Sequence, residues 1–303
     1  MRGIGIGVLL IAVSPSATAH PGTSERLRQL HDQVHADPSD PQVRVRYADE
    51  AIRAEAWTTA RAQARALARL APRSAQVHRI HAEVFLGQGN TRDAEQAFDT
   101  YLATKPEGTR AANAYAARAR IRRARGDLAP ARHDFDAAIL AAPTPDLVLE
   151  RGRLDMERDA LRDASAGYRQ GLKALGETTT VRLALIELEQ RRGQYREALA
   201  ALNPLLARRP GHPDWLLLRA ELLDALQQPV AGIVHRIAAL YLAHRELERR
   251  PTALRRLSVA RAEFAAGRTA HGHAQLQQVL QHTPDLPAAL ALRARHPLPQ
   301  DTP

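Results

Sequence analysis

The chain contains no cysteine among its 303 residues. Disulfide bonds, thiolate metal sites and cysteine nucleophiles are therefore excluded. A bacterial lipoprotein needs a cysteine at its processing site, so lipid anchoring at such a residue is excluded as well. The folded protein must be held together by packing, hydrogen bonds and ion pairs alone.

Aromatic residues are also scarce, at 4% of the chain, and Lys105 and Lys173 are the only lysines. The net charge of +10 therefore comes from arginine. A basic balance can indicate a nucleic acid or another anionic partner, but proteins that bind single-stranded nucleic acid usually add stacking aromatics. We therefore expect no nucleic acid partner and interpret most arginines as solvated. An acidic protein or an anionic polymer stays open as a partner.

Strand patterns and catalytic motifs are missing too. No stretch alternates apolar and polar residues as a half-buried strand would, whereas the helix formers Ala, Leu, Arg, Glu and Gln dominate. The sequence contains no Gly-x-Ser-x-Gly, no phosphate-binding glycine-rich loop and no His-Glu-x-x-His. We therefore predict an all-α protein that is not an enzyme and has no catalytic residues and no cofactor.

Residues 1–19 have the order of a secretory signal peptide. Arg2 gives a positive start, residues 3–13 are apolar, residues 14–16 (Ser-Pro-Ser) break a helix, and residues 17–19 (Ala-Thr-Ala) are small. The apolar stretch is shorter than the roughly 20 residues that span a bilayer, and no other segment is apolar enough to cross one. We expect cleavage before His20 and a periplasmic or secreted product without a transmembrane segment.

Small residues recur at regular intervals through the rest of the chain. One series is Ala60, Ala94, Ala131, Ala164, Ala198, Gly232 and Gly272. Four positions after each stand Ala64, Phe98, Phe135, Tyr168, Leu202, Arg236 and Leu276, and twelve positions before each stand Ala48, Ala82, Ala119, Gly152, Ile186, Ala220 and Ala260. Most intervals are 33 or 34 residues. This spacing indicates a repeated pair of helices that approach closely at the small residues and are filled in by the large ones.

Helix breakers separate the helices of each unit. Glycines stand in the middle of the units at 89, 126, 193 and 267, and Pro or Gly closes them at 72, 106, 143, 176, 210 and 284. Glycine after a helix readily takes the left-handed cap conformation, and proline cannot continue a helix. Asn90 and Asp127 directly follow such glycines, and we predict that their side chains cap the second helices.

The run from Gly89 to Phe98 (Gly-Asn-Thr-Arg-Asp-Ala-Glu-Gln-Ala-Phe), with Pro106 at the end of its unit, resembles the second half of a tetratricopeptide repeat. The runs 126–143 and 193–210 look the same. The family has a period of 34 residues, and the resemblance covers about residues 41–284. It implies a right-handed superhelical solenoid of about seven units: 41–72, 75–106, 112–143, 145–176, 179–210, 213–250 and 253–284. Most first helices lack the family's usual Trp and Tyr, and Arg236 replaces an expected aromatic.

The segments on either side of these units are predicted to cap the solenoid, because its terminal hairpins would otherwise expose apolar faces. The N-terminal segment 20–40 contains a predicted capping helix at 24–36, and a second capping helix is predicted in 285–296. We expect the tail, 297–303, to be disordered. The second helix of the sixth unit is predicted to be long, from Val230 to about Arg249.

The resemblance also implies a binding surface. In this family a partner segment commonly binds the concave face, which the first helices line. The family's groove positions fall on Gln42, Asp49, Arg79, Glu83, Asn113, Arg120, Arg123, Asp146, Arg153, Glu187, Asp214 and Glu221. No lysine stands there, so the family's lysine–asparagine clamp for a C-terminal carboxylate is not expected. The change from arginine in the third unit to acids in the fifth and sixth would orient a partner of matching charge, although all these residues could also be ordinary solvated positions.

The leading prediction is therefore an exported scaffold or adaptor that binds a partner protein, and two alternatives stay open. One is a periplasmic copper or zinc protein, because His31 and His35 lie one helical turn apart and His20 would become the N-terminus. No third ligand stands at a motif spacing, so no metal site is predicted. The other is a structural brace that uses its convex face within an envelope complex.

Two arginine clusters are the densest basic features of the sequence. They comprise Arg118, Arg120, Arg122, Arg123 and Arg125 in one case and Arg245, Arg249, Arg250, Arg255 and Arg256 in the other. A helix distributes such a run around its circumference. Only some members of each cluster could therefore face a single ligand.

Overall fold

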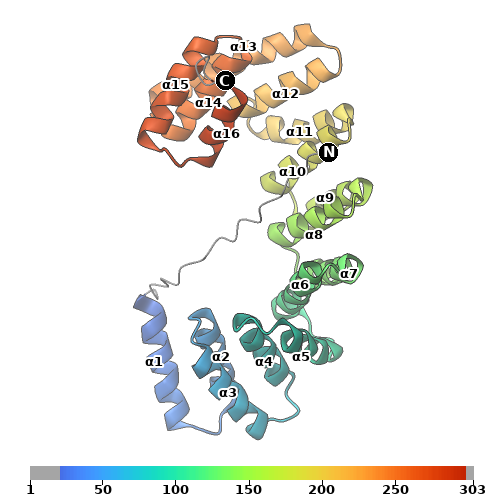
Figure 1. Ribbon diagram of the computed structural model, residues 1–303, viewed down its shortest axis with the longest axis vertical. Coiled ribbons are helices and arrows are strands. Elements are labelled where there is room, and N and C mark those ends of the chain that lie inside the picture. Colours follow the sequence, from blue (N-terminus) through green and yellow to red (C-terminus); the bar gives the residue numbers. More distant parts are fainter. Residues whose placement is uncertain (1–20, 298–303) are drawn as a thin grey trace, which may run out of the picture. The chain divides into compact units, whose positions relative to one another are not determined.

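Helices connected by short turns make up the part of the chain that the computed structural model describes, residues 21–297 (Figure 1). No strand occurs in that range. The predicted all-α repeat fold is therefore confirmed. The predicted signal peptide, His20 and residues 298–303 of the predicted disordered tail lie outside the described residues.

Two compact units divide the chain, Met1–Ala142 and Pro143–Pro303. The first contains α1 (Pro21–Ala36), α2 (Pro41–Arg53), α3 (Trp57–Leu70), α4 (Ala75–Gly87), α5 (Thr91–Ala103), α6 (Gly108–Arg125) and α7 (Leu128–Ala141). The second contains α8 (Pro145–Glu157), α9 (Leu161–Leu175), α10 (Thr179–Arg191), α11 (Tyr195–Arg208), α12 (Pro213–Ala225), α13 (Pro229–Arg249), α14 (Ala253–Ala265), α15 (Thr269–His282) and α16 (Pro287–Arg295). Each range predicted as a repeat corresponds to one helix pair, from α2/α3 to α14/α15, except that α6 begins at Gly108, four residues before the predicted third unit, 112–143.

Within each unit the helices stack in chain order. The two helices of a pair pack on each other, and the second helix of a pair contacts the first helix of the next, as α3 does with α4 and α9 with α10. First helices also contact one another: α2 touches α4, α8 touches α10, and α12 touches α14. Side chains from different pairs can therefore meet on these first helices.

The predicted small residues form the contacts between helices. All members of the two small series are buried, and so are the large partners Phe98, Phe135, Tyr168, Leu202 and Leu276. At Gly152 a Cβ atom would overlap the ring of Tyr168, and at Gly272 it would press on the ring of Phe264. The close approach of the helices at these positions therefore depends on the absence of a side chain.

The sixth pair is the exception, because Arg236 occupies the position of the large apolar residue. Its guanidinium bonds to the carboxylate of Asp224 on α12. The same carboxylate lies against Gly232, where a Cβ atom would collide with Asp224 Oδ1. An ion pair between the two helices thus replaces the apolar contact that the other pairs make at this position.

Left-handed residues make the turns inside the pairs. The predicted glycines Gly89, Gly126, Gly193 and Gly267 have φ values of 77°, 90°, 68° and 75°. The pairs without such a glycine use Glu55, Asp159 and Gln227, at φ values of 55°, 57° and 61°. Since only glycine adopts this region without steric cost, three turns carry local strain that the other four avoid.

The two predicted helix caps have different outcomes. The side chain of Asn90 accepts a hydrogen bond from the backbone N–H of Asp93 at 3.3 Å, as predicted. The prediction for Asp127 is wrong, because its side chain caps no backbone N–H. The Asp127 carboxylate accepts a hydrogen bond from Arg125 instead. A charge-assisted bond of this kind is stronger than one from a neutral amide.

Candidate functional site

In the first unit, the predicted groove residues of α2 and α4 bind one another. Arg79 is only 3% exposed, and its guanidinium donates to Asp49 at 2.6 Å, to Glu83 at 2.8 Å and to Gln76 at 2.7 Å. Asp49 also accepts a hydrogen bond from Arg110 of α6 at 3.0 Å. These side chains belong to first helices, and their ion pairs join α2, α4 and α6.

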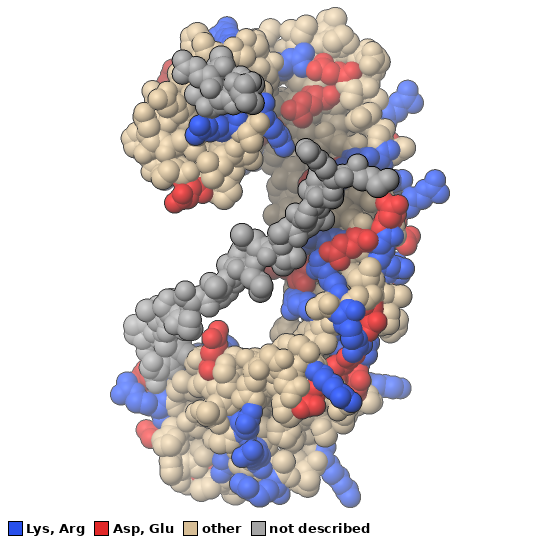
Figure 2. Space-filling model, in the orientation of Figure 1, with Lys and Arg blue, Asp and Glu red and all other residues tan. Residues whose placement is uncertain are grey.

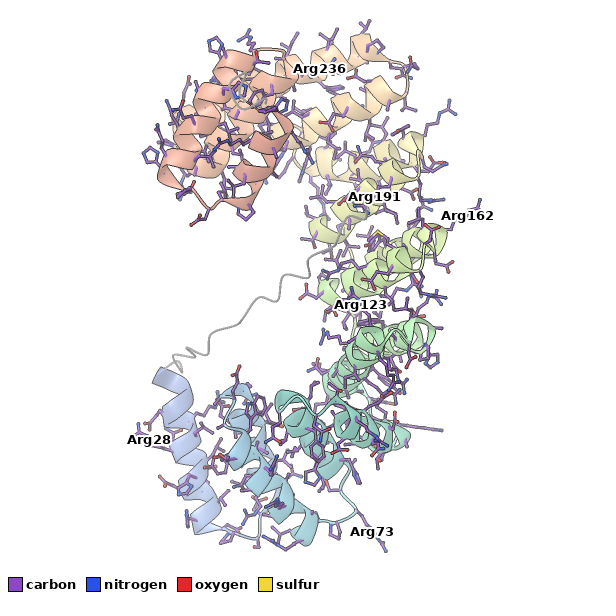
Figure 3. The ribbon with its side chains drawn as sticks, viewed as in Figure 1. Arg28, Arg73, Arg123, Arg162, Arg191 and Arg236 are labelled. Atoms are coloured by element: carbon purple, nitrogen blue, oxygen red, sulfur yellow. The ribbon has the colours of Figure 1, made fainter. Side chains whose placement is uncertain are left out.

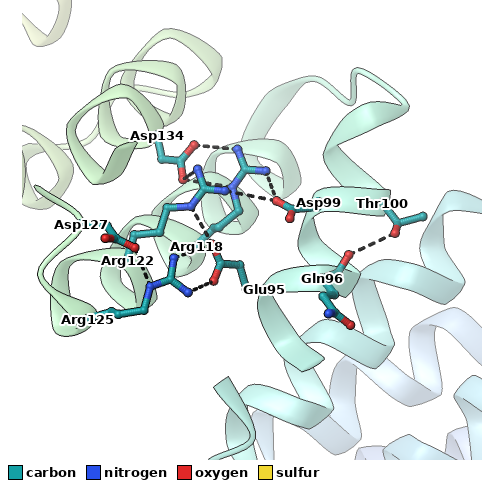
Figure 4. A network of polar contacts seen from close by, with 9 residues as sticks. All are labelled: Glu95, Gln96, Asp99, Thr100, Arg118, Arg122, Arg125, Asp127 and Asp134. Atoms are coloured by element: carbon teal, nitrogen blue, oxygen red, sulfur yellow. Dashed lines mark hydrogen bonds and ion pairs between the residues drawn. The ribbon is translucent and has the colours of Figure 1, made fainter. Parts of the chain in front are cut away.

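The first arginine cluster has a similar structural role (Figure 4). Arg118 binds both oxygens of Asp134, at 2.6 and 3.0 Å, and Arg122 binds Asp134 and Glu95, at 2.9 and 2.8 Å. Arg125 binds Glu95 at 2.8 Å. Asp134 is fully buried, so these ion pairs join α5, α6 and α7 from within. Partial burial would raise the pKa of Glu95, but the hydrogen bonds from Arg122 and Arg125 outweigh it and hold that pKa below its usual value.

Other predicted positions of this unit lie on its surface. Gln42, Asn113 and Arg120 are exposed, and Arg123 is half-buried. Arg123 projects from α6 in Figure 3.

The second arginine cluster lies in the second unit. Arg256 binds Gln275 at 2.9 Å and Arg255 binds the carbonyl oxygen of Arg250 at 3.0 Å. Several members of both clusters therefore have partners within the protein.

The second unit carries a pocket of about 430 Å³ on its first helices, which we call the α8–α10 pocket. Leu149, Arg153 and Met156 of α8, Tyr168 of α9, and Ala184, Glu187, Leu188 and Arg191 of α10 line it. Most of these side chains are apolar, and the charged ones are two arginines and one glutamate. The predicted groove residues Arg153 and Glu187, which come from neighbouring pairs, meet here.

The charged groups of this pocket bond only to their own helices in the described part of the chain. Arg153 Nε donates to the carbonyl oxygen of Leu149 at 3.4 Å, and Arg191 pairs with Glu187 at 3.3 Å. Arg191 lies on α10, whereas Arg162 extends outward from the start of α9 (Figure 3). Burial raises the pKa of the Tyr168 hydroxyl, while the charges of Arg153 and Glu187 act on it in opposite directions. The pocket therefore combines an apolar floor with net positive charge.

A second pocket of about 450 Å³ lies among α12, α13, α14 and α16, and we call it the α12–α16 pocket. Its lining includes the predicted groove residues Asp214 and Glu221, together with Arg236, Arg261, Phe264, Leu292, Arg295 and His296. The imidazole of His296 stacks on Phe264 with the ring centroids 4.0 Å apart. The predicted C-terminal capping helix α16 thus supplies one wall of this pocket, which sequence analysis did not predict.

The acids of the α12–α16 pocket differ in their partners. Asp214 accepts a hydrogen bond from the hydroxyl of Ser258 at 2.9 Å and pairs with Arg261 at 3.5 Å. Desolvation raises the pKa of Glu221, although the positive charge of Arg295 opposes the shift. The remaining predicted acid, Asp146, is exposed in the first turn of α8. The acidic character predicted for the sixth unit is therefore partly cancelled by arginines from other helices.

Sequence reasoning missed several buried acids. Asp155 pairs with Arg151 at 2.7 Å, and Glu189 accepts hydrogen bonds from Ser165 at 2.6 Å and Arg169 at 2.8 Å. Both acids are fully buried. Asp155 and Glu189 each stand three positions after a member of the first-helix series, Gly152 and Ile186. This shared spacing is the sequence signal that could have identified them as buried.

The histidines form no metal site within residues 21–297. The rings of His31 and His35 lie 4.5 Å apart, and His31 Nδ1 is 3.3 Å from the hydroxyl of Tyr47. No group of three or more His, Asp or Glu residues in this range could hold a metal ion. His20, the third residue of the proposed alternative, lies outside the described residues.

Basic and acidic side chains intermingle on the face shown in Figure 2. No helix among residues 21–297 is both long and apolar enough to span a bilayer. On the face that Figure 2 shows, charges of one sign therefore form no large continuous field.

Comparison with known proteins supports the repeat assignment. A family model described as "Tetratricopeptide repeat" matches residues 45–109, 81–146 and 183–233, which together make up just over half of the chain. No curated protein is significantly similar to it in sequence.

Solved structures with tetratricopeptide repeats are similar to this chain, and one of them aligns with a TM-score above 0.5. The C-terminal part of a TPR repeat-containing protein from Cytophaga hutchinsonii aligns with a TM-score of 0.54 and 15% identity, covering 82% of this chain and 98% of the other. A tetratricopeptide repeat protein from Parabacteroides merdae aligns with a TM-score of 0.45 and 15% identity, covering 83% and 96%. In the APC/C hetero-tetramer Cut9-Hcn1, the match has a TM-score of 0.42 and 13% identity and covers 91% of this chain but 53% of the other, so this chain spans about half of that longer one.

Proposed function

The chain belongs to the tetratricopeptide repeat family, and on that premise we propose that it is an exported, non-catalytic scaffold that binds a segment of a partner protein on its first-helix face. The repeats support a protein-interaction scaffold in general. The identity of the site, the chemistry of the partner and the location are our proposals. They rest on the pocket chemistry and on residues 1–19.

The α8–α10 pocket carries the proposal. Its apolar residues can bury one large apolar side chain of the partner, which stabilises a complex by about 25 cal/mol per Å² of apolar surface removed from water. Arg153 has only a carbonyl of its own helix as a partner among the described residues, so its guanidinium can turn to a carboxylate of the ligand. We therefore propose that the partner segment presents an apolar residue next to an acidic one.

The contrast with the first unit supports this choice of site. Arg79, Arg118 and Arg122 are bound to buried or half-buried acids of other helices, and redirecting them to a ligand would break these ion pairs. Leaving a buried charge unpaired costs several kcal/mol. Arg153 and Arg191 can change partners at much lower cost, because both are exposed and each contacts only a residue one turn away on its own helix.

The binding proposal is tested with the mature form, which begins at His20. Partners would be captured from an envelope extract of the source organism with the wild type and with an Arg153→Glu, Arg191→Glu variant. We expect the variant to lose a partner that the wild type retains. Arg162→Glu is the matched control, because Arg162 is an exposed arginine on the second helix α9. Equal capture by all three proteins would place the site elsewhere, and the same comparison with Arg120→Glu, Arg123→Glu would then test α6.

The export proposal rests on the signal-like order of residues 1–19 and has its own test. The full chain would be expressed in a Gram-negative host, and the N-terminal sequence of the protein in the periplasmic fraction would be determined. We expect it to begin at His20. An intact N-terminus beginning at Met1, or recovery only from the cytoplasm, would contradict export without affecting the binding proposal.

A further inference from the structure

Helix α13 exposes a row of large apolar side chains. Val230 is 77% exposed, Val234 61%, Ile237 63% and Tyr241 65%. They follow one another at intervals of four, three and four residues, which places them on one face of the helix. We call these four residues the α13 stripe, and Ile233, 48% exposed, lies beside it.

The surface area of the stripe is large for a monomeric protein. The four residues and Ile233 together expose an area on the order of 500 Å², near the upper end of the apolar patches found on monomers. The row extends over about 16 Å of helix, at 1.5 Å per residue. A surface of this size indicates a contact with another molecule.

The charges around the stripe argue against a lipid surface. Helices that lie on anionic membranes carry lysines and arginines beside their apolar face. Between Val230 and Ala243, Arg236 is the only charged residue, and its guanidinium is bonded to Asp224. Within α13, the stripe therefore has almost no charge beside it, which favours a partner surface that is itself apolar.

We propose that the α13 stripe pairs with the α13 stripe of a second copy of this chain, with the two helices antiparallel. The spacing of four, three and four residues reads the same in both directions, as a two-fold axis requires. Antiparallel pairing places Val230 opposite Tyr241 of the second copy, and Val234 opposite Ile237. Each residue thus meets an apolar residue, and alternating intervals of three and four are those at which helices pack side by side.

The exposed area sets the strength of this dimer. Stable interfaces bury about 800 Å² on each partner, and the stripe with Ile233 provides over half of that. The dimer is therefore weak and forms reversibly with concentration. This inference uses a second helix and none of the residues that line the α8–α10 pocket, so it can fail without affecting the proposed function.

The first test measures the mass of the mature form in solution. Light scattering coupled to size-exclusion chromatography should give a mass that doubles as the protein concentration rises. Val234→Glu, Ile237→Glu should stay at the mass of one copy at every concentration. Leu140→Glu is the matched control, because Leu140 is an exposed apolar residue of another helix and should dimerise like the wild type. Circular dichroism verifies that each variant is folded. A wild type that remains at the mass of one copy, or a double variant that still dimerises, would overturn the proposal.

A second test checks the antiparallel geometry and uses the absence of cysteine from the chain. Val230→Cys and Tyr241→Cys variants would be mixed and treated with a short thiol-specific cross-linker. Cross-linking in the mixture well above that of either variant alone supports the antiparallel pair. Cross-linking of Val230→Cys with itself at the level of the mixture would contradict it, as would no cross-linking in any sample.

Discussion

Two sets of arginines on first helices, one set in each unit, are used in different ways. In Met1–Ala142, Arg79, Arg118 and Arg122 bond to acids on neighbouring helices. In Pro143–Pro303, Arg153 and Arg191 bond only within their own helices, at the α8–α10 pocket. An arginine that fills a gap between helices stabilises the fold, whereas one at the edge of a pocket stays available to a ligand. The acids opposite it, and not the arginine itself, make the difference.

The largest expected effect comes from removing the acid at the centre of the first network. Asp134→Ala leaves Arg118 and Arg122 without their buried partner, and we expect it to lower the free energy of unfolding by about 3 kcal/mol, at the low end for a broken buried pair. Urea denaturation would measure it. Arg153→Ala should change the stability by less than about 0.5 kcal/mol, as for a surface substitution. Equal losses for the two variants would remove the distinction between the units.

In the second unit, adding a methyl group at a close helix contact should lower the stability more than removing Arg153 does. Gly152→Ala places a methyl group where the ring of Tyr168 lies, and overpacking of this kind costs about 1–3 kcal/mol. Because Tyr168 also lines the α8–α10 pocket, partner binding should weaken together with the stability. Gly211→Ala is the control, since a Cβ atom there would meet only side-chain atoms of Leu242 at 3.6 Å or more. A stable Gly152→Ala protein that binds normally would show that the ring can move aside without consequence.

The turns allow the units to be compared at the level of single backbone conformations. Gly126→Ala, at φ 90°, should destabilise the first unit by about 1 kcal/mol because of the left-handed conformation. Gln227→Gly, at φ 61°, should stabilise the second unit, by less than about 1 kcal/mol because glycine also loses more entropy on folding. Thermal unfolding of each variant and of the wild type would measure both changes in stability. Shifts of the same sign would mean that the turn conformation does not control the result.

The smallest effects concern pH, and the two units should respond with opposite signs. The folded-state pKa of Glu95 is lowered, so its ionised form stabilises the protein above the unfolded pKa of about 4.3. That contribution is lost as the pH falls through the lower folded value. The pKa of Glu221 is raised, so its stabilising contribution is present below the unfolded pKa and is lost as the pH rises through the folded value.

At pH 7, Glu95→Gln should therefore lower the stability and Glu221→Gln should raise it, and both differences should shrink on acidification. Urea denaturation of the two variants and the wild type across this pH range would measure them. Identical pH profiles for both variants would mean that the environments of the two carboxylates do not differ as described.

Much of the architecture could be predicted because it depends on local rules. Small residues twelve positions apart predicted the helix pairs, and the glycines at 89, 126, 193 and 267 predicted the turns, since both requirements act within one hairpin. The C-terminal ends of α10 and α13 are followed closely by breakers visible in the sequence, Gly193 and Pro251. Asp127 shows the limit of such rules, because Arg125 competes with the backbone for its carboxylate.

The candidate site could be predicted only in part. Arg153 and Glu187 were placed on neighbouring first helices by family resemblance, and they do line one pocket. Arg79 was also placed on a first helix by family resemblance, but it is buried. Its guanidinium lies 2.6 Å from the carboxylate of Asp49, which is 30 residues away in sequence. Nothing in the local sequence of α4 distinguishes these outcomes.

The sequence by itself determined that this chain forms paired helices, since the period of small residues and breakers is a property of each unit taken alone. Only the tertiary structure decided which charged side chains pair with one another inside the protein and which line a pocket. It also placed α16 as one wall of the α12–α16 pocket. It also decided that the apolar face of α13 faces outward. These outcomes depend on which side chain of a different helix pair lies opposite. A pattern that all repeats share does not show which residues of a neighbouring repeat depart from it.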